Sequence, residues 1–113
     1  MKYILTFITS LSFITVMSQL PHATSGSLKR LEKFSSAFVA SRNIDIWLPD
    51  HYDTTKKYSV LYMHDGQALF DSSIMWNHQA WYANEAATKL ISEGKIDEFI
   101  IVGIWNNGGL RFA

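Results

Sequence analysis

"YSVLYMHDGQALFD", residues Tyr58–Asp71, is the stretch that decides the fold. It opens with an apolar, β-prone run, Val60–Met63, and then breaks into the polar residues His64, Asp65, Gly66 and Gln67. An apolar run that stops at a glycine-containing polar turn predicts a buried strand ending in a tight loop. In open α/β sheets, ligands bind in the crevice beyond the carboxyl ends of the strands. The polar residues are therefore candidates for a site, and Gly66 can adopt backbone conformations that aim an N–H group into such a crevice.

Strand and helix patterns flank this stretch. Before it, Arg42–Leu48 alternates with the two-residue period of a half-buried, antiparallel strand. After it, apolar residues at three- and four-residue spacing predict a helix from Asn77, its N-cap, to Glu93, with Gly94 as its C-terminal stop. The apolar run Phe99–Trp105 predicts a second strand, covered on both faces. Strand, helix and strand in this order form one right-handed βαβ unit, so the predicted fold class is α/β with a mostly parallel sheet.

The whole chain divides into three parts. Residues 1–18 are interpreted as a signal peptide, residues 19–33 as a linker and lead-in, and residues 34–113 as the truncated, N-terminal part of the domain. Within the domain, apolar residues at strand-like spacing predict a further strand over Phe34–Ala40.

The first 18 residues have the pattern of an export signal. Lys2 is a positive n-region, Ile4–Val16 is mostly apolar and uncharged, and cleavage after Ser18 would leave Gln19 as the first residue. We therefore expect a secreted or periplasmic protein with no stable membrane insertion after cleavage. The alternative is an uncleaved membrane anchor, because the length of the uncharged stretch approaches that of a membrane-spanning helix.

Composition and charge are those of a globular domain. The chain has 113 residues, of which 48% are hydrophobic and 18% charged, which suits one small domain. Ten basic and ten acidic residues balance without a basic patch, which argues against a nucleic-acid partner. The lack of cysteine excludes disulfides and thiolate metal sites. Adjacent residues such as His64 and Asp65 seldom converge on one ion, so we expect no metal and no cofactor.

Taken in order, these pieces resemble a known family. The sequence KYSVLYMHDGQALFD, preceded by SRNIDIWLPDHYD and followed by LISEGKIDEFIIVGIWNN, is similar to the N-terminal part of the putative-esterase family of α/β-hydrolases. That family includes enterochelin-esterase-like, feruloyl-esterase-like and mycolyltransferase-like enzymes. The resemblance implies the N-terminal portion of an α/β-hydrolase fold. It also implies that Gln67 supplies a backbone N–H to an oxyanion hole, where a fixed donor needs no reorganisation as charge develops.

The resemblance and the position of the loop suggest further residues that contact a substrate. Asp65, Gly66 and Trp76 follow the end of the strand, and Arg111 comes after WNNGG on the same side of the sheet. The resemblance implies that an arginine near this point organises the loop or binds an acidic group. The alternatives are a plain tight turn at Gly66, loop-fixing hydrogen bonds for Asp65, packing for Trp76 and a solvated side chain for Arg111.

The function expected of the parent protein is hydrolysis of carboxylic esters through an acyl-enzyme. A serine, activated by a histidine and oriented by an acid, would attack a small-molecule or carbohydrate ester. The α/β-hydrolase nucleophile needs a G-x-S-x-G elbow, and none of the six glycines frames such a serine. We therefore expect this chain to be a truncated, N-terminal part of an esterase-like protein that is inactive alone. We also expect the strand at Phe99–Trp105 to have an open, unpaired edge. Two alternatives stay open: an acyltransferase of the same fold, and a non-catalytic carbohydrate- or siderophore-binding module.

Overall fold

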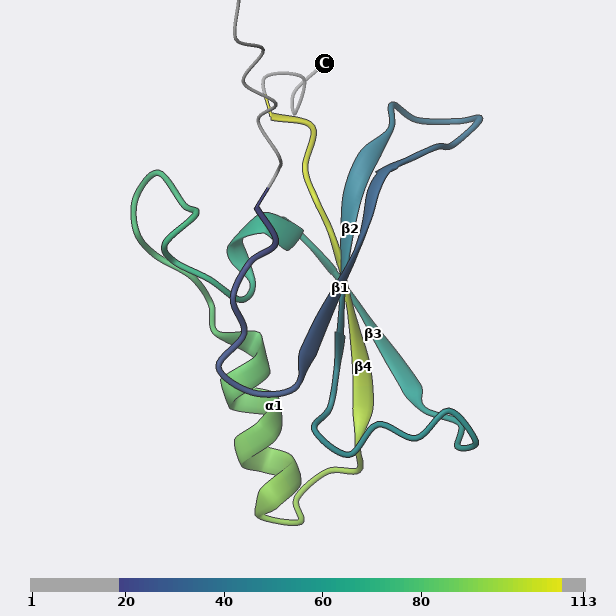
Figure 1. Cartoon of the computed structure of the whole chain (residues 1–113), viewed down its shortest axis with the longest axis vertical. Coiled ribbons are helices and arrows are strands. Elements are labelled where there is room, and N and C mark those ends of the chain that lie inside the picture. The colour runs from purple at the N-terminus through teal and green to yellow at the C-terminus, as the bar shows by residue number, and fades with distance from the viewer. Residues whose placement is uncertain (1–18, 109–113) are drawn as a thin grey trace, which may run out of the picture.

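The computed structural model describes residues 19–108, which form a four-stranded sheet with a helix on one side (Figure 1). The strand order is β1-β2-β4-β3; β2 is antiparallel to β1 and β4, and β3 is parallel to β4. Residues 1–18 and 109–113 lie outside the described part, and so do the expected signal peptide and Arg111. The elements are β1 (Ser27–Phe34), β2 (Arg42–Leu48), β3 (Ser59–His64), the 3₁₀ turn η1 (Gly66–Ala68), α1 (Ala83–Ser92) and β4 (Phe99–Ile104).

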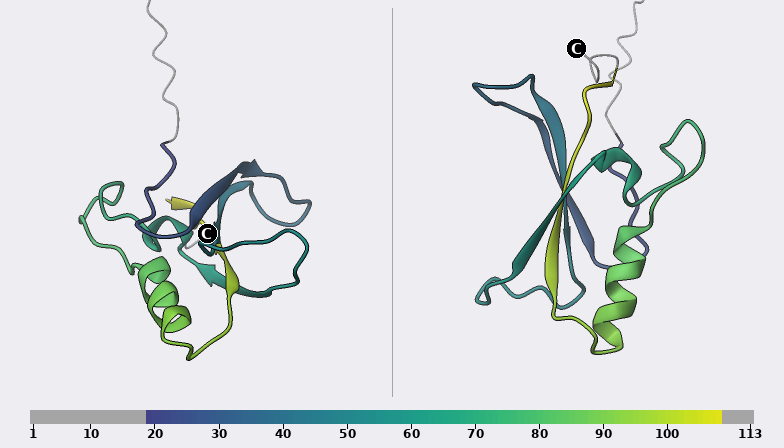
Figure 2. Two further views of the ribbon diagram at one scale, coloured as in Figure 1. Left: turned by 60° about the horizontal axis from the view of Figure 1, so that its bottom comes forward. Right: turned by 180° about the vertical axis from the view of Figure 1, so that it is seen from behind.

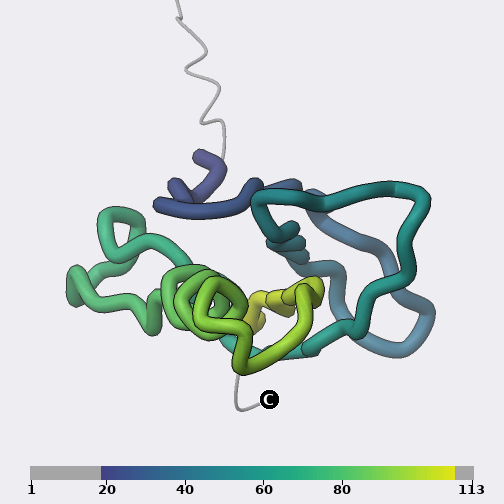
Figure 3. The backbone as a smooth tube through the Cα atoms, turned by 90° about the horizontal axis from the view of Figure 1, so that it is seen from below, coloured from purple at the N-terminus to yellow at the C-terminus, as the bar shows by residue number. Residues whose placement is uncertain are grey.

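The unit β3-α1-β4 confirms the predicted α/β class and the strand–helix–strand order. Within residues 19–108 the sheet is mixed, because the β1-β2 hairpin adds two antiparallel pairings beside β4. Two further views show α1 lying along one side of the sheet, with the lead-in on that side as well (Figures 2 and 3). No helix in this part of the chain has the length and apolar character needed to cross a bilayer.

The core lies between the sheet and α1. Trp47 of β2 is fully buried, and its indole N–H donates to the Ser25 carbonyl oxygen at 2.7 Å, which ties the lead-in to the core. Burial of one large apolar side chain contributes roughly 1.5–3 kcal/mol. The buried core cluster consists of Trp47, Leu69, Phe70, Ala87 and Ile101.

β2 has the bounds and the antiparallel pairing that its alternation predicts. The fully buried side is the one that carries Asp45 and Trp47, whereas Ile44 and Ile46 on the opposite side are only half-buried. A fully buried carboxylate is rare unless it is paired. Arg30 of β1 supplies the partner, because the register places it directly opposite Asp45.

The helix begins later than its pattern predicts. It starts at Ala83 rather than Asn77, because Tyr82 has a left-handed backbone (φ 51°) that no α-helix can include. The residues before it hydrogen-bond to the segment after β3 instead. The N–H of Trp81 donates to the Ala68 carbonyl and that of Ala83 to the Leu69 carbonyl, both at 2.9 Å. These two bonds hold the start of α1 against the end of η1.

The C-terminal stop at Gly94 is confirmed, with φ at 66°. Its N–H donates to the Ile91 carbonyl and the Lys95 N–H donates to the Leu90 carbonyl, both at 3.0 Å, which is the hydrogen-bond pattern of a Schellman motif. The apolar spacing that predicts the helix places Ala87 and Leu90 on one stripe facing the core, and only part of that stripe is buried. Ala87 faces the core, while Leu90 is 37% exposed.

The strand predicted over Phe34–Ala40 is wrong. The strand is β1, Ser27–Phe34, which lies mostly within the segment interpreted as linker and lead-in. Its C-terminal end is already irregular, because Lys33 has a positive φ of 45° and the pairing register shifts between Leu31 and Phe34. Residues 35–41 form the exposed connection to β2.

β3 has the predicted position but is not buried. Only Met63 among its residues is partly shielded, and Tyr62 is 68% exposed. Its partner in the described part of the chain is β4 alone, whereas β4 is paired on both sides, by β2 and β3. The expectation of an open edge on Phe99–Trp105 is therefore wrong. Among residues 19–108, the open apolar edge belongs to β3.

Candidate functional site

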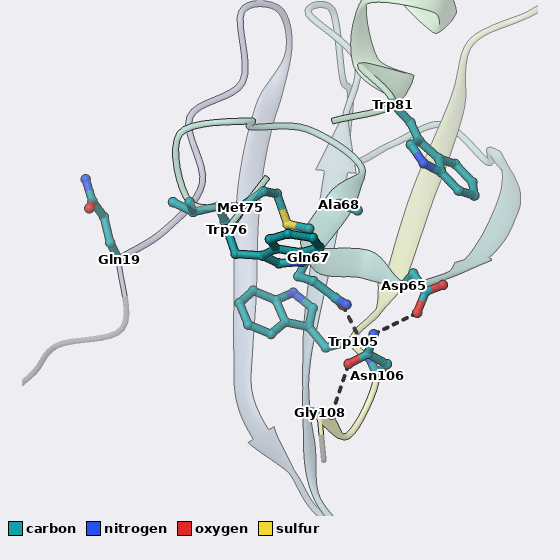
Figure 4. A pocket seen from close by; sticks show the side chains of 11 residues that line it. Gln19, Asp65, Gln67, Ala68, Met75, Trp76, Trp81, Trp105, Asn106 and Gly108 are labelled. Atoms are coloured by element: carbon teal, nitrogen blue, oxygen red, sulfur yellow. Dashed lines mark hydrogen bonds between the residues drawn. The ribbon is translucent and has the colours of Figure 1, made fainter. Parts of the chain in front are cut away.

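A pocket of about 680 Å³ lies beyond the carboxyl ends of β3 and β4 (Figure 4). Ligands bind at this end of open α/β sheets, and the size falls in the range of roughly 300–1,000 Å³ found for small-molecule sites. Its walls come from the lead-in, the loop at η1, the segment before α1 and the segment after β4. The lining residues are Gln19, Asp65, Gln67, Ala68, Ile74, Met75, Trp76, Trp81, Trp105, Asn106 and Gly108.

The pocket brings together three of the predicted site residues, Asp65, Gln67 and Trp76. Gly66 is buried behind the wall, so it does not face a ligand. Arg111 lies outside the described residues. Among residues 19–108, no group of three or more acidic or histidine side chains is placed to hold a metal ion.

The loop after β3 turns sharply because of two neighbouring backbone features. Asp65 takes the left-handed conformation, with φ 54° and ψ 43°, and Gly66 follows as the first residue of η1. Gly66 itself has no positive φ. A Cβ at this position would lie 2.5 Å from the Gly103 carbonyl carbon and 2.6 Å from its oxygen. The expected role of Gly66 as the flexible backbone position is therefore wrong: glycine is needed so that the loop can lie directly on β4.

Asn106 fastens this loop to the segment after β4. Its side-chain Nδ2 donates to Asp65 Oδ1 at 2.9 Å, and its backbone N–H donates to Gln67 Oε1 at 3.2 Å. The Gly108 N–H in turn donates to Asn106 Oδ1 at 3.0 Å. Asp65 therefore uses a carboxylate oxygen to fix the loop, which is the alternative weighed for it from sequence. The hydrogen bonds to Asp65 and to the Gln67 side chain therefore hold the Gln67 backbone in place.

The backbone amide of Gln67 lies at the start of η1. The amides of Ala68 and Leu69 close the turn by donating to the carbonyls of Asp65 and Gly66, at 2.8 and 3.4 Å. Within residues 19–108 the Gln67 N–H has no such acceptor, as is usual for the first amides of a helical turn. Gln67 also lines the pocket, so this fixed donor is a candidate to stabilise an oxygen that gains negative charge there.

Aromatic side chains form much of the remaining wall. Trp76 and Trp81 are 88% and 64% exposed, and Trp105 follows β4 directly (Figure 4). Exposed indoles around a polar loop suit a ligand with a flat apolar part and a polar group to be fixed. Trp105 and Asn106 were missed as candidates from sequence. The signal that could have found them is the rule that parallel strands end at the same edge, which places "WN" after β4 beside "DGQ" after β3.

Asp71 lies close to this region but has a structural role. Its Oδ2 accepts the His22 N–H at 2.7 Å and its Oδ1 accepts the Ser73 N–H at 2.8 Å. Hydrogen bonding from the Ser73 side chain, and then from the His22 backbone, lowers the pKa of the Asp71 carboxyl. The carboxylate thus pins the lead-in to the segment after η1.

Known proteins resemble this chain in two ways, through a family model and through solved structures. A family model described as "Putative esterase" matches residues 35–112. Among solved structures, a mutant of the feruloyl esterase module from Clostridium thermocellum complexed with sinapinate is similar, with a TM-score of 0.51 and 20% identity over 74% of this chain and 28% of that one. A ferulic acid esterase from the anaerobic fungus Anaeromyces mucronatus has a TM-score of 0.50 and 26% identity, over 75% of this chain and 31% of that one. The chain thus spans less than a third of the length of either solved enzyme.

Proposed function

This chain belongs to the Putative esterase family, and on that premise we propose that it forms the oxyanion side of the active site of a secreted carboxylic-ester hydrolase. The observation that carries the proposal is the loop at η1. Gln67 lines the pocket, its backbone amide has no acceptor among the described residues, and the loop is held in place by Asn106 and by the contact between Gly66 and Gly103.

The reaction we propose is acyl transfer to a serine and then to water. The serine oxygen adds to the ester carbonyl, the carbonyl oxygen becomes an oxyanion, and the Gln67 N–H donates to it. Collapse of this intermediate expels the alcohol and leaves the acyl-enzyme, which water hydrolyses. No G-x-S-x-G elbow occurs in these 113 residues, so we assign the serine, histidine and acid to other parts of the complete protein.

The substrate class we propose is an ester whose acyl group is aromatic. Three indoles, Trp76, Trp81 and Trp105, line the pocket, and an aromatic acyl group can pack on them. The 26% identical neighbour from Anaeromyces mucronatus is a ferulic acid esterase, which supports this class. Export is supported by Lys2, the uncharged run and the cleavage pattern around Ser18.

The test is hydrolysis of methyl ferulate, compared with p-nitrophenyl acetate, by the protein expressed from its complete coding sequence. We expect turnover of both and a higher kcat/KM for methyl ferulate, because only the larger acyl group reaches the indoles. Release of ferulate with methanol as the second product distinguishes hydrolysis from transfer to an added alcohol. Failure of the pure, folded protein to cleave any ester would refute the proposal.

A further inference from the structure

Three indoles line the pocket, and among the described residues the ring of one of them, Trp105, is held by a buried charge. It follows β4, and its backbone N–H donates to the Asn43 carbonyl of β2 at 3.1 Å. Its indole Nε1–H donates to Asp45 Oδ2 at 2.7 Å. Trp105 is therefore held by both its backbone and its indole ring, and the same residue lines the pocket.

Asp45 is itself held by Arg30. Arg30 Nε and Nη2 donate to the two carboxylate oxygens at 2.7 and 2.8 Å, a bidentate pair. The two side chains are only 4% and 0% exposed. The Arg30 guanidinium carbon also lies 4.6 Å from the centroid of the Trp105 ring, within reach of a cation–π contact. Arginine, carboxylate and indole thus form a closed triangle in which each member contacts the other two.

The register of the sheet explains why this triangle lies beside the loop at η1. Arg30, Asp45 and Gly103 stand opposite one another on β1, β2 and β4. Gly103 is also the residue on which Gly66 lies. The row that carries the ion pair therefore includes Gly103, the residue on which the loop at η1 lies.

Arg30 holds a second wall of the pocket. Its Nη1 donates to the carbonyl oxygen of Gln19, a pocket-lining residue of the lead-in, at 2.9 Å. Arg30 and Gln19 both lie before residue 35, where the match to the family begins. A feature outside the matched region therefore shapes the pocket that the matched region supplies.

Stability alone does not account for such a pair, because well-packed apolar residues often replace a buried ion pair at no cost in stability. We propose that Arg30 and Asp45 are positioning residues that fix the Trp105 ring as the surface on which the acyl group of an aromatic ester packs, an inference that rests on the proposed function. A preformed aromatic surface lowers the entropy cost of binding. Its contact with the acyl group is the same before and during the reaction, so it acts on KM rather than kcat.

The test uses the complete protein and the double substitution Arg30→Met/Asp45→Leu, which removes both charges and leaves no unpaired buried one. We expect KM for methyl ferulate to rise about threefold to tenfold, as Trp105→Phe also does, with kcat within about twofold. KM for p-nitrophenyl acetate should stay unchanged. The matched control is Glu93→Gln/Lys95→Gln, which removes an exposed ion pair at the end of α1 and should alter neither constant. A rise in KM with Trp105→Phe but none with the double substitution would overturn the proposal.

A second measurement tests the positioning of Trp105 without relying on ester hydrolysis. The chain has four tryptophans, and their indole N–H signals can be resolved by ¹⁵N NMR and assigned with Trp→Phe variants. We expect slow solvent exchange of the Trp105 indole proton in the wild type and at least tenfold faster exchange in the double variant, with Trp47 unchanged because it donates to Ser25. Ferulate binding, followed by tryptophan fluorescence, should weaken in parallel. If no ester is cleaved, the proposed function fails, and these two readouts still decide the positioning: equal exchange in both proteins would refute it.

Discussion

Replacing Gly66 with alanine should destabilise the protein and displace the oxyanion loop, although it adds only one methyl group. The added Cβ would lie 2.5 Å from the Gly103 carbonyl carbon, 2.6 Å from its oxygen and 2.9 Å from the Ile104 nitrogen. The shortest of these distances is about 1 Å less than the lower limit of ordinary contact, 3.4 Å. All three atoms are backbone atoms of β4, which cannot rotate away as a side chain would.

The expected cost follows from this geometry. Overpacking by one methyl group in a close-packed interior typically costs about 1–3 kcal/mol, and the upper half of that range applies here because the neighbours are backbone. The loop must lift off β4 to relieve the contact, which moves the Gln67 amide. A displacement of about 1 Å at a catalytic group can reduce kcat a hundredfold. We therefore expect a loss of about 2–3 kcal/mol in the free energy of unfolding and a large loss of kcat.

The assay is urea unfolding of the complete protein, followed by circular dichroism, with ester hydrolysis measured on the same samples. Gly94→Ala is the matched control, because that glycine has open space around it and a positive φ of 66°. It should cost only about 1 kcal/mol, from backbone strain, and leave kcat unchanged. A Gly66→Ala protein within about 0.5 kcal/mol of the wild type would refute the account of the loop contact.

Two further predictions concern stability and association. Because hydrogen bonds lower the pKa of Asp71 in the folded state, its carboxylate stabilises the fold above the ordinary pKa of 3.8, and this contribution is lost as the pH falls through the folded value. Asp71→Asn should therefore lower the urea midpoint at pH 7, by an amount that shrinks as the pH falls below 3.8, and equal midpoints at pH 7 would contradict this. The isolated 113-residue chain should associate through the open edge of β3, and Tyr62→Lys, at a 68% exposed position, should reduce the association. Sedimentation velocity would measure this, and a monomeric wild-type chain would show that the edge is not adhesive.

Local patterns predict the regular elements of this fold well where neighbouring contacts agree with them. The alternation of Arg42–Leu48 predicts β2 with its observed bounds, and Gly94 predicts the end of α1. The start of α1 is not predictable in this way. Hydrogen bonds from Trp81 and Ala83 to the segment after β3 hold residues that would otherwise extend the helix, and these bonds join parts of the chain that are far apart in sequence.

The same reason limits what sequence reveals of the candidate site. The polar residues after β3 point to Gln67 because a strand followed by a glycine-containing turn is a local signal. The ion pair of Arg30 and Asp45 gives no such signal, since its arginine lies in the segment interpreted as linker and lead-in. Trp105 becomes part of the site only when β4 is placed beside β3.

The most direct test of the central claim compares Gln67→Pro with Gln67→Ala in the complete, ester-cleaving protein. Proline removes the amide proton, and this costs no hydrogen bond within the described structure because the Gln67 N–H has no acceptor there. Gln67→Ala keeps the backbone amide and loses the side-chain carboxamide, whose oxygen accepts the Asn106 N–H. With circular dichroism and melting temperature matched to the wild type, kcat should fall by about a hundredfold to a thousandfold for proline and stay within about tenfold for alanine. Near-wild-type kcat in a well-folded Gln67→Pro protein would place the oxyanion donor elsewhere and contradict the account.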